Sequence, residues 1–336
     1  QERRGTGVLF ITHDFGVVAE IADRVVVMKH GRIVEQGSRD EVLQNPKEEY
    51  TQMLMASVPS MTPPERESVQ GEKALDVAGL NKVYGRKGLF SNDRIVHAAK
   101  DVTLLIRKGE TLGIVGESGS GKSTVARCIA RLIEPTSGTI HLEGLEIGTI
   151  SQSKLRPHRK RVQIVFQDPY RSLNPRRKIG LSLIEAPVNF GMTKEQAIKE
   201  AGDLMTLVGL SPDALDRYPH QFSGGQRQRI CIARALAVRP EVLIADEAVS
   251  ALDVSVQAQV LDLLDDIREK YNLAMLFITH DLRVAAQICD RLIVMQNGLV
   301  VEEGATHHVY AHPQQEYTQQ LLDAAPGADV AFGLAR

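Results

Sequence analysis

The sequence has no apolar run of the roughly 18 residues that a membrane-spanning helix needs, and its first residues do not resemble a signal peptide. Any association with a membrane would therefore depend on partner proteins. Cysteine is also scarce, since Cys128, Cys231 and Cys289 stand singly within apolar segments without a C-x-x-C spacing. We exclude a disulfide framework and a cysteine metal site, and expect small buried residues in a reducing compartment.

Net charge is low as well. The 40 lysines and arginines nearly balance the 42 aspartates and glutamates, which leaves a formal charge of −2. This balance argues against a general nucleic-acid-binding surface, so we expect no direct nucleic-acid partner. The chain of 336 residues, with 43% hydrophobic residues, has the composition of a globular protein and the length of one large domain with an additional segment.

The beginning of the chain repeats near its end in unbroken register. Val8 to Asp14 corresponds to Met275 to Asp281, an offset of 280 − 13 = 267, and the same offset carries Pro46 onto Pro313. This period is too long for a solenoid and indicates two copies of one large domain. We expect residues 1–57 to be the last part of a first copy, and to be poorly ordered or packed on the second copy because their apolar strands would be exposed alone.

The segment after the partial copy, residues 58–72, is rich in proline, serine and glutamate and is typical of an inter-domain linker. The complete copy covers residues 73–325, and residues 326–336 form a tail. Short alternating runs from 74 to about 106 predict an antiparallel β-subdomain. Strands are expected at 111–115, 140–142, 162–166, 242–245 and 275–278, and helices at 124–132, 193–208, 226–237 and 254–270. This order predicts an α/β fold with a mainly parallel sheet flanked by helices.

Residues 116–123 form a complete G-x-x-x-x-G-K-[ST] motif between an expected strand and an expected helix. Its glycines allow consecutive backbone N–H groups to form an anion nest at a helix N-terminus. Lys122 is expected to reach the β- and γ-phosphates of a nucleotide, and the Ser123 hydroxyl to ligate Mg²⁺. The expected nucleotide-binding residues here are Gly116, Ser118, Gly119, Ser120, Gly121, Lys122, Ser123 and Thr124. A glycine-rich turn with a solvated lysine is the alternative, and the flanking elements argue against it.

Further motifs stand at fixed places around this loop. They are Tyr84, Gln167 within Phe-Gln-Asp-Pro, Phe222-Ser223-Gly224-Gly225-Gln226 at a helix start, Asp246-Glu247 at a strand end, Ser250-Ala251-Leu252-Asp253, and His280. In this order and spacing, residues 73–325 resemble a complete ATP-binding cassette (ABC) and residues 1–57 resemble the tail of another. The resemblance implies a P-loop NTPase core with an antiparallel β-subdomain and a helical signature subdomain.

The five residues from Phe222 to Gln226 resemble the ABC signature, with Phe222 where leucine is commoner. Alone, they would be only a turn before a helix. In the family this motif closes over the γ-phosphate on the opposite cassette, so that two cassettes sandwich each ATP. The resemblance therefore assigns Ser223, Gly224, Gly225 and Gln226 to the nucleotide of an opposing cassette, and their position at a helix start suits a phosphate contact.

The strand ending in Asp246-Glu247 resembles the Walker B strand, whose acids face the nucleotide at the carboxyl edge of the sheet. The resemblance implies that Asp246 holds Mg²⁺ and that Glu247 is the general base that orients the attacking water. Two solvated acids at a strand end are the structural alternative. Ala248-Val249 stand where Pro-Thr is common in the family.

The same resemblance assigns four more side chains. His280 resembles the switch histidine that contacts the γ-phosphate, and its recurrence as His13 favours function over a purely structural role. Gln167 resembles the Q-loop glutamine, which touches Mg²⁺ and water, and Asp253 lies in a segment that resembles the D-loop, which contacts the facing cassette. Tyr84 resembles the aromatic residue that stacks on adenine; a core tyrosine of the β-subdomain is the alternative.

These motifs predict an ATPase in which ATP joins two cassettes and Glu247 aids in-line attack of water on the γ-phosphate. The tail of each copy, with Tyr50-Thr51-Gln52 or Tyr317-Thr318-Gln319, resembles that of dipeptide and oligopeptide importers, which also serve glutathione and nickel. We therefore expect a peripheral subunit on the cytoplasmic face of the inner membrane. Its partners would be integral membrane permease subunits, a second cassette and, indirectly, a solute-binding protein.

Two alternatives stay open from the sequence. A soluble twin-cassette ATPase acting on ribosomes or nucleic acid could use the basic run at 156–161, although such relatives tend to have a long charged helical linker and residues 58–72 are short and broken by proline. The chain could also be an inert ATP-binding fragment, because its first copy lacks a phosphate loop, a signature and an acidic strand end.

Overall fold

The computed structural model of the chain describes residues 6–85, 87–88, 91–92 and 95–326. Of the tail expected at 326–336, only Pro326 falls within this part, and the other ten residues lie outside it. None of the helices in the described residues has the length and apolar character of a membrane-spanning segment.

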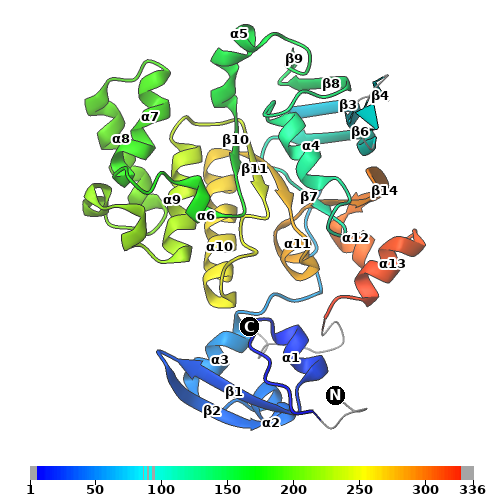
Figure 1. Cartoon of the computed structure of the whole chain (residues 1–336), viewed down its shortest axis with the longest axis vertical. Coiled ribbons are helices and arrows are strands. Elements are labelled where there is room, and N and C mark those ends of the chain that lie inside the picture. The colour runs from blue at the N-terminus through cyan, green and yellow to red at the C-terminus, as the bar shows by residue number, and fades with distance from the viewer. Residues whose placement is uncertain (1–5, 86, 89–90, 93–94, 327–336) are drawn as a thin grey trace.

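A six-stranded sheet forms the centre of the large body (Figure 1). In spatial order it contains β10 (Val162–Val165), β11 (Val242–Asp246), β12 (Ala274–Ile278), β7 (Thr111–Val115), β13 (Arg291–Gln296) and β14 (Leu299–Ala305). The first five strands run parallel, and β14 is antiparallel to β13. Every residue of β7, β11 and β12 is buried, as expected for parallel strands with both faces covered.

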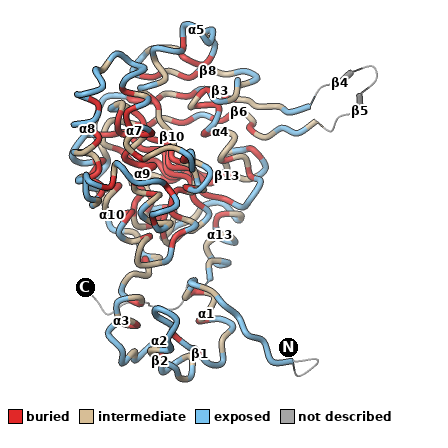
Figure 2. The backbone as a smooth tube through the Cα atoms, turned by 60° about the vertical axis from the view of Figure 1, so that its left-hand side comes forward, coloured by how far each residue is buried: buried red, intermediate tan, exposed pale blue. Residues whose placement is uncertain are grey.

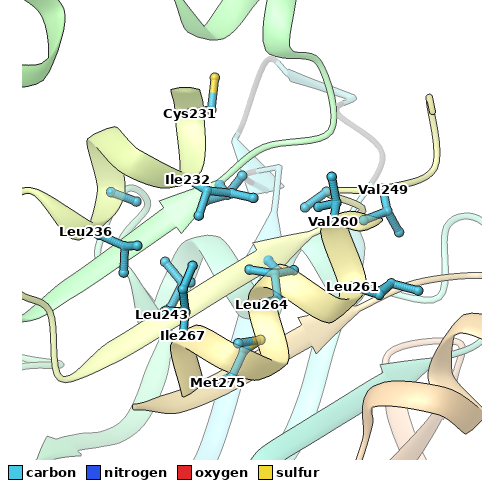
Figure 3. Packing of buried hydrophobic residues seen from close by; sticks show 14 of the residues in the cluster. Cys231, Ile232, Leu236, Leu243, Val249, Val260, Leu261, Leu264, Ile267 and Met275 are labelled. Atoms are coloured by element: carbon cyan, nitrogen blue, oxygen red, sulfur yellow. The ribbon is translucent and has the colours of Figure 1, made fainter. Parts of the chain in front are cut away.

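Helices α4 (Lys122–Ile129), α9 (Gly224–Leu236), α10 (Val254–Tyr271) and α11 (Leu282–Ile288) complete this body. Successive side chains of a strand point to opposite faces of the sheet. Leu243 and Met275 accordingly join the cluster that contains Leu264 of α10, as Figure 3 shows, whereas Ile244 joins the cluster that contains Val125 of α4. The sheet therefore lies between two apolar layers.

Two smaller units flank the central sheet. Strands β6 (Val96–Arg107), β3 (Lys73–Tyr84), β8 (Ser137–Leu142) and β9 (Leu145–Glu146) form an antiparallel sheet, and β4 (Lys87–Gly88) pairs with β5 (Ser91–Asn92). Helices α5 (Gln152–Leu155), α6 (Pro169–Ser172), α7 (Ile179–Asn189) and α8 (Lys194–Leu207) follow, and α8 opens with the expected capping box of Thr193 and Gln196. The predicted α/β class with an antiparallel and a helical subdomain is confirmed.

The first repeat folds into the same elements as the end of the second. It contains α1 (Phe15–Ile21), β1 (Arg24–Lys29), β2 (Arg32–Ser38), α2 (Arg39–Gln44) and α3 (Glu49–Ala56). Adding 267 to each bound gives α11, β13, β14, α12 (Thr306–Ala311) and α13 (Glu316–Asp323). The irregularity in the hairpin recurs too, between Val27 and Met28 and between Val294 and Met295. The repeat therefore holds in structure as well as in sequence.

Of the two outcomes expected for residues 1–57, poor order is wrong for residues 15–57, and residues 13–16 line a cavity together with the second copy. Residues 15–57 form a sheet and three helices around an apolar cluster of Val25, Val27 and Val42 (Figures 1 and 2). The segment from Val8 to Thr12 forms no strand, although its counterpart is the buried strand β12. The reason is that none of the described strands lies beside it, so its backbone has no ladder to join.

Candidate nucleotide-binding site

The phosphate-binding motif connects β7 to α4 as predicted. A Cβ atom on Gly116 would lie 2.2 Å from the Met295 carbonyl oxygen, and one on Gly121 would lie 2.1 Å from that of Ala98. Both glycines also have positive φ angles, 143° and 107°, so only glycine fits these two positions. Helix α4 begins at Lys122, two residues earlier than predicted, because Gly121 in its left-handed conformation is the N-cap. It ends at Ile129, before Arg131, whose φ is also positive.

Lys122 lies beneath this loop with only 4% of its surface exposed. Its Nζ donates hydrogen bonds to the carbonyl oxygens of Gly116 (2.7 Å) and Glu117 (2.8 Å). Burial lowers the pKa of the Lys122 ammonium, against the opposing effect of three nearby carboxylates. The hydroxyl of Ser120, in the same loop, is buried and has no hydrogen-bond partner among the described residues. An ammonium and an unpaired hydroxyl at a helix N-terminus fit a phosphate ligand.

Ser123 and Asp246 meet at the end of β11. The Ser123 hydroxyl donates to Asp246 Oδ1 at 2.8 Å, and Asp246 is only 5% exposed. Burial raises the pKa of the Asp246 carboxyl, against the opposing effects of the Ser123 hydrogen bond and of the nearby Arg127 and Lys122. A hydroxyl and a carboxylate are hard oxygen ligands, which Mg²⁺ prefers when it also binds substrate phosphates. Among the described residues, no group of three or more His, Cys, Asp or Glu side chains has an arrangement that could hold a metal ion by itself.

Replacing Asp246 with asparagine is expected to stabilise the nucleotide-free protein by about 1 kcal/mol, or a few degrees in Tm. The physical reason is that the buried carboxylate is costly and the amide oxygen still accepts the Ser123 hydroxyl. Because the pKa of Asp246 is raised, its destabilising effect grows as pH rises from the ordinary carboxyl range through the raised pKa. In calorimetric melts, Asp246→Asn should raise the Tm above that of wild type by more at pH 7 than at pH 4. A lower Tm than wild type at pH 7 would contradict this account.

Glu247 follows Asp246 in a left-handed backbone conformation, with φ of 52°. A non-glycine residue in this region is strained by about 1–3 kcal/mol, and such strain is commonest at functional sites. Its N–H is held by the Ile278 carbonyl oxygen (2.9 Å), and its carboxylate lies 3.6 Å from His280 Nδ1. His280 is 55% exposed at its side chain, so this pair lies at the surface of the site. A carboxylate paired with an imidazole can accept and pass on a proton.

Ser250 links the turn at Glu247 to the loop that contains Gln167, a role that the sequence did not reveal. Its Oγ donates to the Glu247 carbonyl oxygen (3.0 Å) and lies 3.3 Å from Gln167 Nε2, which donates to it. The Gln167 side chain is therefore linked to the Glu247 turn, and no hydrogen bond joins it to Ser123 or Asp246 in the described part. Within Ser250–Asp253, Asp253 is the exposed N-cap residue of α10. A serine three residues after an acid at a strand end is too common a pattern to have identified this link.

The signature and Tyr84 stand apart from these groups. Ser223 and Gln226 form a capping box at the start of α9, and a Cβ on Gly225 would lie 2.3 Å from Val256 Cγ1, so a glycine allows α9 to approach α10. Helices α9 and α4 lie in different parts of the body (Figure 1). Tyr84 is 40% exposed at the end of β3, which suits a contact surface better than a core. The chain thus assembles the loop, Asp246, Glu247 and His280, and displays its signature elsewhere.

Comparison with known proteins agrees with this geometry. A family model described as "ABC transporter" matches residues 99–250, and one described as "Oligopeptide/dipeptide transporter, C-terminal region" matches residues 34–85. The glutathione import ATP-binding protein GsiA of Salmonella choleraesuis (strain SC-B67) is 46% identical over 357 aligned positions, covering 98% of this chain and 57% of the relative. The same protein of Shigella dysenteriae serotype 1 is 44% identical with the same coverage. The chain therefore spans a little over half the length of these relatives.

Solved structures give the same picture. The ATP-binding cassette MJ0796, solved as a dimer in a post-hydrolysis state with ADP and Pi, matches with a TM-score of 0.62 and 29% identity, covering 69% of this chain and 98% of its own. CbiO1 of Clostridium perfringens, part of the transporter complex cbiONQ, matches with a TM-score of 0.62 and 27% identity, covering 76% and 96%. The order of the motifs, the fold and these matches agree that residues 99–250 of this chain belong to the ABC transporter family.

Proposed function

We propose that this chain binds and hydrolyses ATP with Mg²⁺ and so powers an importer of glutathione, short peptides or related small solutes. The observation that carries the proposal is the juxtaposition of buried Lys122 under its loop, the Ser123–Asp246 pair and the strained Glu247 beside His280. The glutathione importer relatives and the match to the oligopeptide transporter C-terminal region support the type of cargo.

Each side chain has a definite part in this proposal. The Lys122 ammonium donates hydrogen bonds to the β- and γ-phosphates. Ser123, Asp246 and Gln167 are the residues that would hold Mg²⁺. Bound Mg²⁺ supplies neutralisation of the phosphate charge. The Glu247 carboxylate accepts a hydrogen bond from the attacking water and receives its proton, while His280 steadies that carboxylate and the γ-phosphate. Tyr84 stacks on adenine. Ser223 to Gln226 and Asp253 serve the nucleotide and loops of an opposing cassette.

Residues 1–57 are proposed to be the tail of a first cassette, followed by the linker at 58–72 and the complete cassette at 73–325. The support is a difference in burial between counterparts. Leu9 and Ile11 are 89% and 90% exposed, whereas Leu276 and Ile278 are fully buried; Met28 is 58% exposed, whereas Met295 is fully buried. In the second repeat β7 pairs with both strands, β12 and β13, and these three residues belong to the apolar cluster that contains Val125 of α4. The body of a first cassette would cover the exposed apolar face of the first repeat.

The proposed partners follow from the family and from the uncovered apolar face of the first repeat. We propose that the chain works with integral membrane permease subunits, and through them with a solute-binding protein, on the cytoplasmic face of the inner membrane. A pull-down from membranes tests this directly. Recovery of multi-span hydrophobic proteins would support the importer, whereas recovery of ribosomal proteins would favour the soluble twin-cassette alternative.

The ATPase itself is tested by Mg²⁺-dependent ATP turnover of the purified chain against its concentration. Turnover per chain that rises with concentration means that complete cassettes pair with each other and supply the opposing signature. Binding of ATP without turnover at any concentration would mean that the chain is an ATP-binding fragment and would overturn the proposed hydrolysis for this chain alone.

A further inference from the structure

Segment 58–72 contacts the complete copy (residues 73–325) at several points, despite its linker composition. Pro59 is buried, and its carbonyl oxygen accepts a hydrogen bond from Arg283 Nη1 at 3.2 Å. Met61 packs against the larger apolar cluster of the body. At the other end, the Gly71 carbonyl oxygen accepts from Arg107 (2.8 Å). A free tether would leave these groups in water, so this segment has a defined path.

Arg66 makes the most extensive polar contacts of this segment. Its guanidinium donates to the carbonyl oxygens of Gln287 (2.7 Å) and Ile288 (3.5 Å), the last two residues of α11. These carbonyls lack partners within the helix, and a cation at a helix C-terminus also interacts favourably with its dipole. Arg283 lies in the first turn of the same helix. The segment is therefore fastened at both ends of α11, the helix that begins directly after His280 and Asp281.

The same guanidinium belongs to a group of charged side chains beside the start of β7. Arg66 lies 3.3 Å from Asp290 and 3.7 Å from Asp265, and Arg268 lies 3.4 Å from Asp290 and 2.8 Å from Asp265. Asp290 is 7% exposed, and its second oxygen accepts the N–H of Thr111, the first residue of β7 (2.7 Å). Arg268 also lies 3.5 Å from the exposed Glu269. Loss of Arg66 would leave the buried Asp290 to share Arg268 with the other carboxylates, and removing one partner of a buried ion pair is costly.

The small lobe that precedes this segment (residues 15–57) lies beside residues 279–284, which contain His280 and are called the switch turn here. Residues 13–16 of the first repeat and residues 279–281, 283 and 284 of the second line one cavity of about 130 Å³ together with Val249 and Ser250. Gly16 is the counterpart of Arg283, since 283 − 267 = 16. A Cβ on Gly16 would lie 2.4 Å from the Pro326 carbonyl oxygen, the atom that accepts from Arg283 Nη2 at 3.1 Å. The two counterparts thus lie beside the same carbonyl oxygen.

We propose that residues 58–72 are a strap that holds the first-repeat turn against the switch turn, and that Arg66 is the positioning residue that fastens it. Because the strap grips both ends of α11, the position of the first repeat and the orientation of the helix behind His280 are coupled. Arg66 touches no substrate. It acts through α11 and through the Asp290 contact at the base of β7, the strand that leads into the phosphate loop.

The test is a distance measurement between spin labels at Glu49→Cys on α3 and Lys154→Cys on α5. Both positions are exposed, and the three native cysteines are buried, so only the introduced thiols would be labelled. We expect one narrow distance distribution for the parent chain and a distribution about twice as wide for Arg66→Gln. Glu67→Gln, an exposed charge removal next to Arg66, is the matched control and should leave the width unchanged. Arg66→Lys keeps the charge but not the fork of donors and should lie between them.

Turnover supplies a second readout, which rests on the proposed ATPase function, whereas the distance measurement does not. Arg66→Gln should lower kcat about fivefold, the scale of coupling through a packed network, with an unchanged KM for ATP. A parent-like width in Arg66→Gln would overturn the strap, whatever the turnover. A widened distribution with parent-like kcat would keep the strap and overturn the coupling to His280. If melting shows that Arg66→Gln does not fold, Arg66→Lys decides by the same two criteria.

Discussion

Replacing Glu247 with glutamine is expected to lower ATP turnover by about 10²- to 10⁴-fold, the usual contribution of a general base. Glutamine has the same shape, tolerates the same left-handed backbone and can still bond to His280, which lies 3.6 Å from the Glu247 carboxylate. It cannot accept the proton of the attacking water. Steady-state phosphate release measures the loss, and equilibrium binding of ATP should stay within about twofold of the parent chain because no phosphate contact is removed.

The matched control is Glu195→Gln, an exposed acid in the first turn of α8 that lies in another subdomain. It should leave both quantities unchanged. Because hydrolysis releases a paired cassette in the proposed cycle, Glu247→Gln should also accumulate as a dimer in MgATP on size-exclusion chromatography. Parent-like turnover in Glu247→Gln would remove Glu247 from the catalytic role and leave its backbone strain without a functional explanation.

Replacing Lys122 with alanine is expected to weaken ATP binding by about 100-fold or more, since two charge-assisted hydrogen bonds contribute roughly 1.5–3 kcal/mol each. The ammonium already lies within the loop, bonded to the carbonyl oxygens of Gly116 and Glu117, and is thus placed where a phosphate would enter. Isothermal titration with ATP measures the change. The fold should survive, because burial already disfavours the charged form of Lys122 and lowers its pKa.

Lys199→Ala on the exposed surface of α8 removes the same charge far from the loop and serves as the control. It should bind ATP as the parent chain does. If Lys122→Ala bound ATP with the parent affinity while its melting temperature fell sharply, Lys122 would be a structural lysine that ties the loop together, and the phosphate role would pass to the backbone N–H groups.

Much of this site could be predicted because its parts are local. The spacing from Gly116 to Ser123 specifies a turn that only glycine can make at two points, and the apolar run before Asp246 specifies a buried strand. The exact start of α4 was missed because its N-cap, Gly121, has no side chain to make the hydrogen bond that usually marks a helix start. Burial of Lys122 and the left-handed backbone of Glu247 also escaped the sequence, since both depend on neighbours from other strands.

The family resemblance, the order of the motifs and the repeat could be recognised from the residues alone, because they depend on residue identity and spacing. The roles of the repeat and the linker became visible in the fold. Val8 to Thr12 has the composition of a buried strand, yet it stays outside any sheet, because strand formation needs neighbours that supply hydrogen bonds and cover. Arg66 lies in a segment of linker composition, yet it bonds to α11 and Asp290. These partners are far from Arg66 in the sequence, and only the fold brings them close to it.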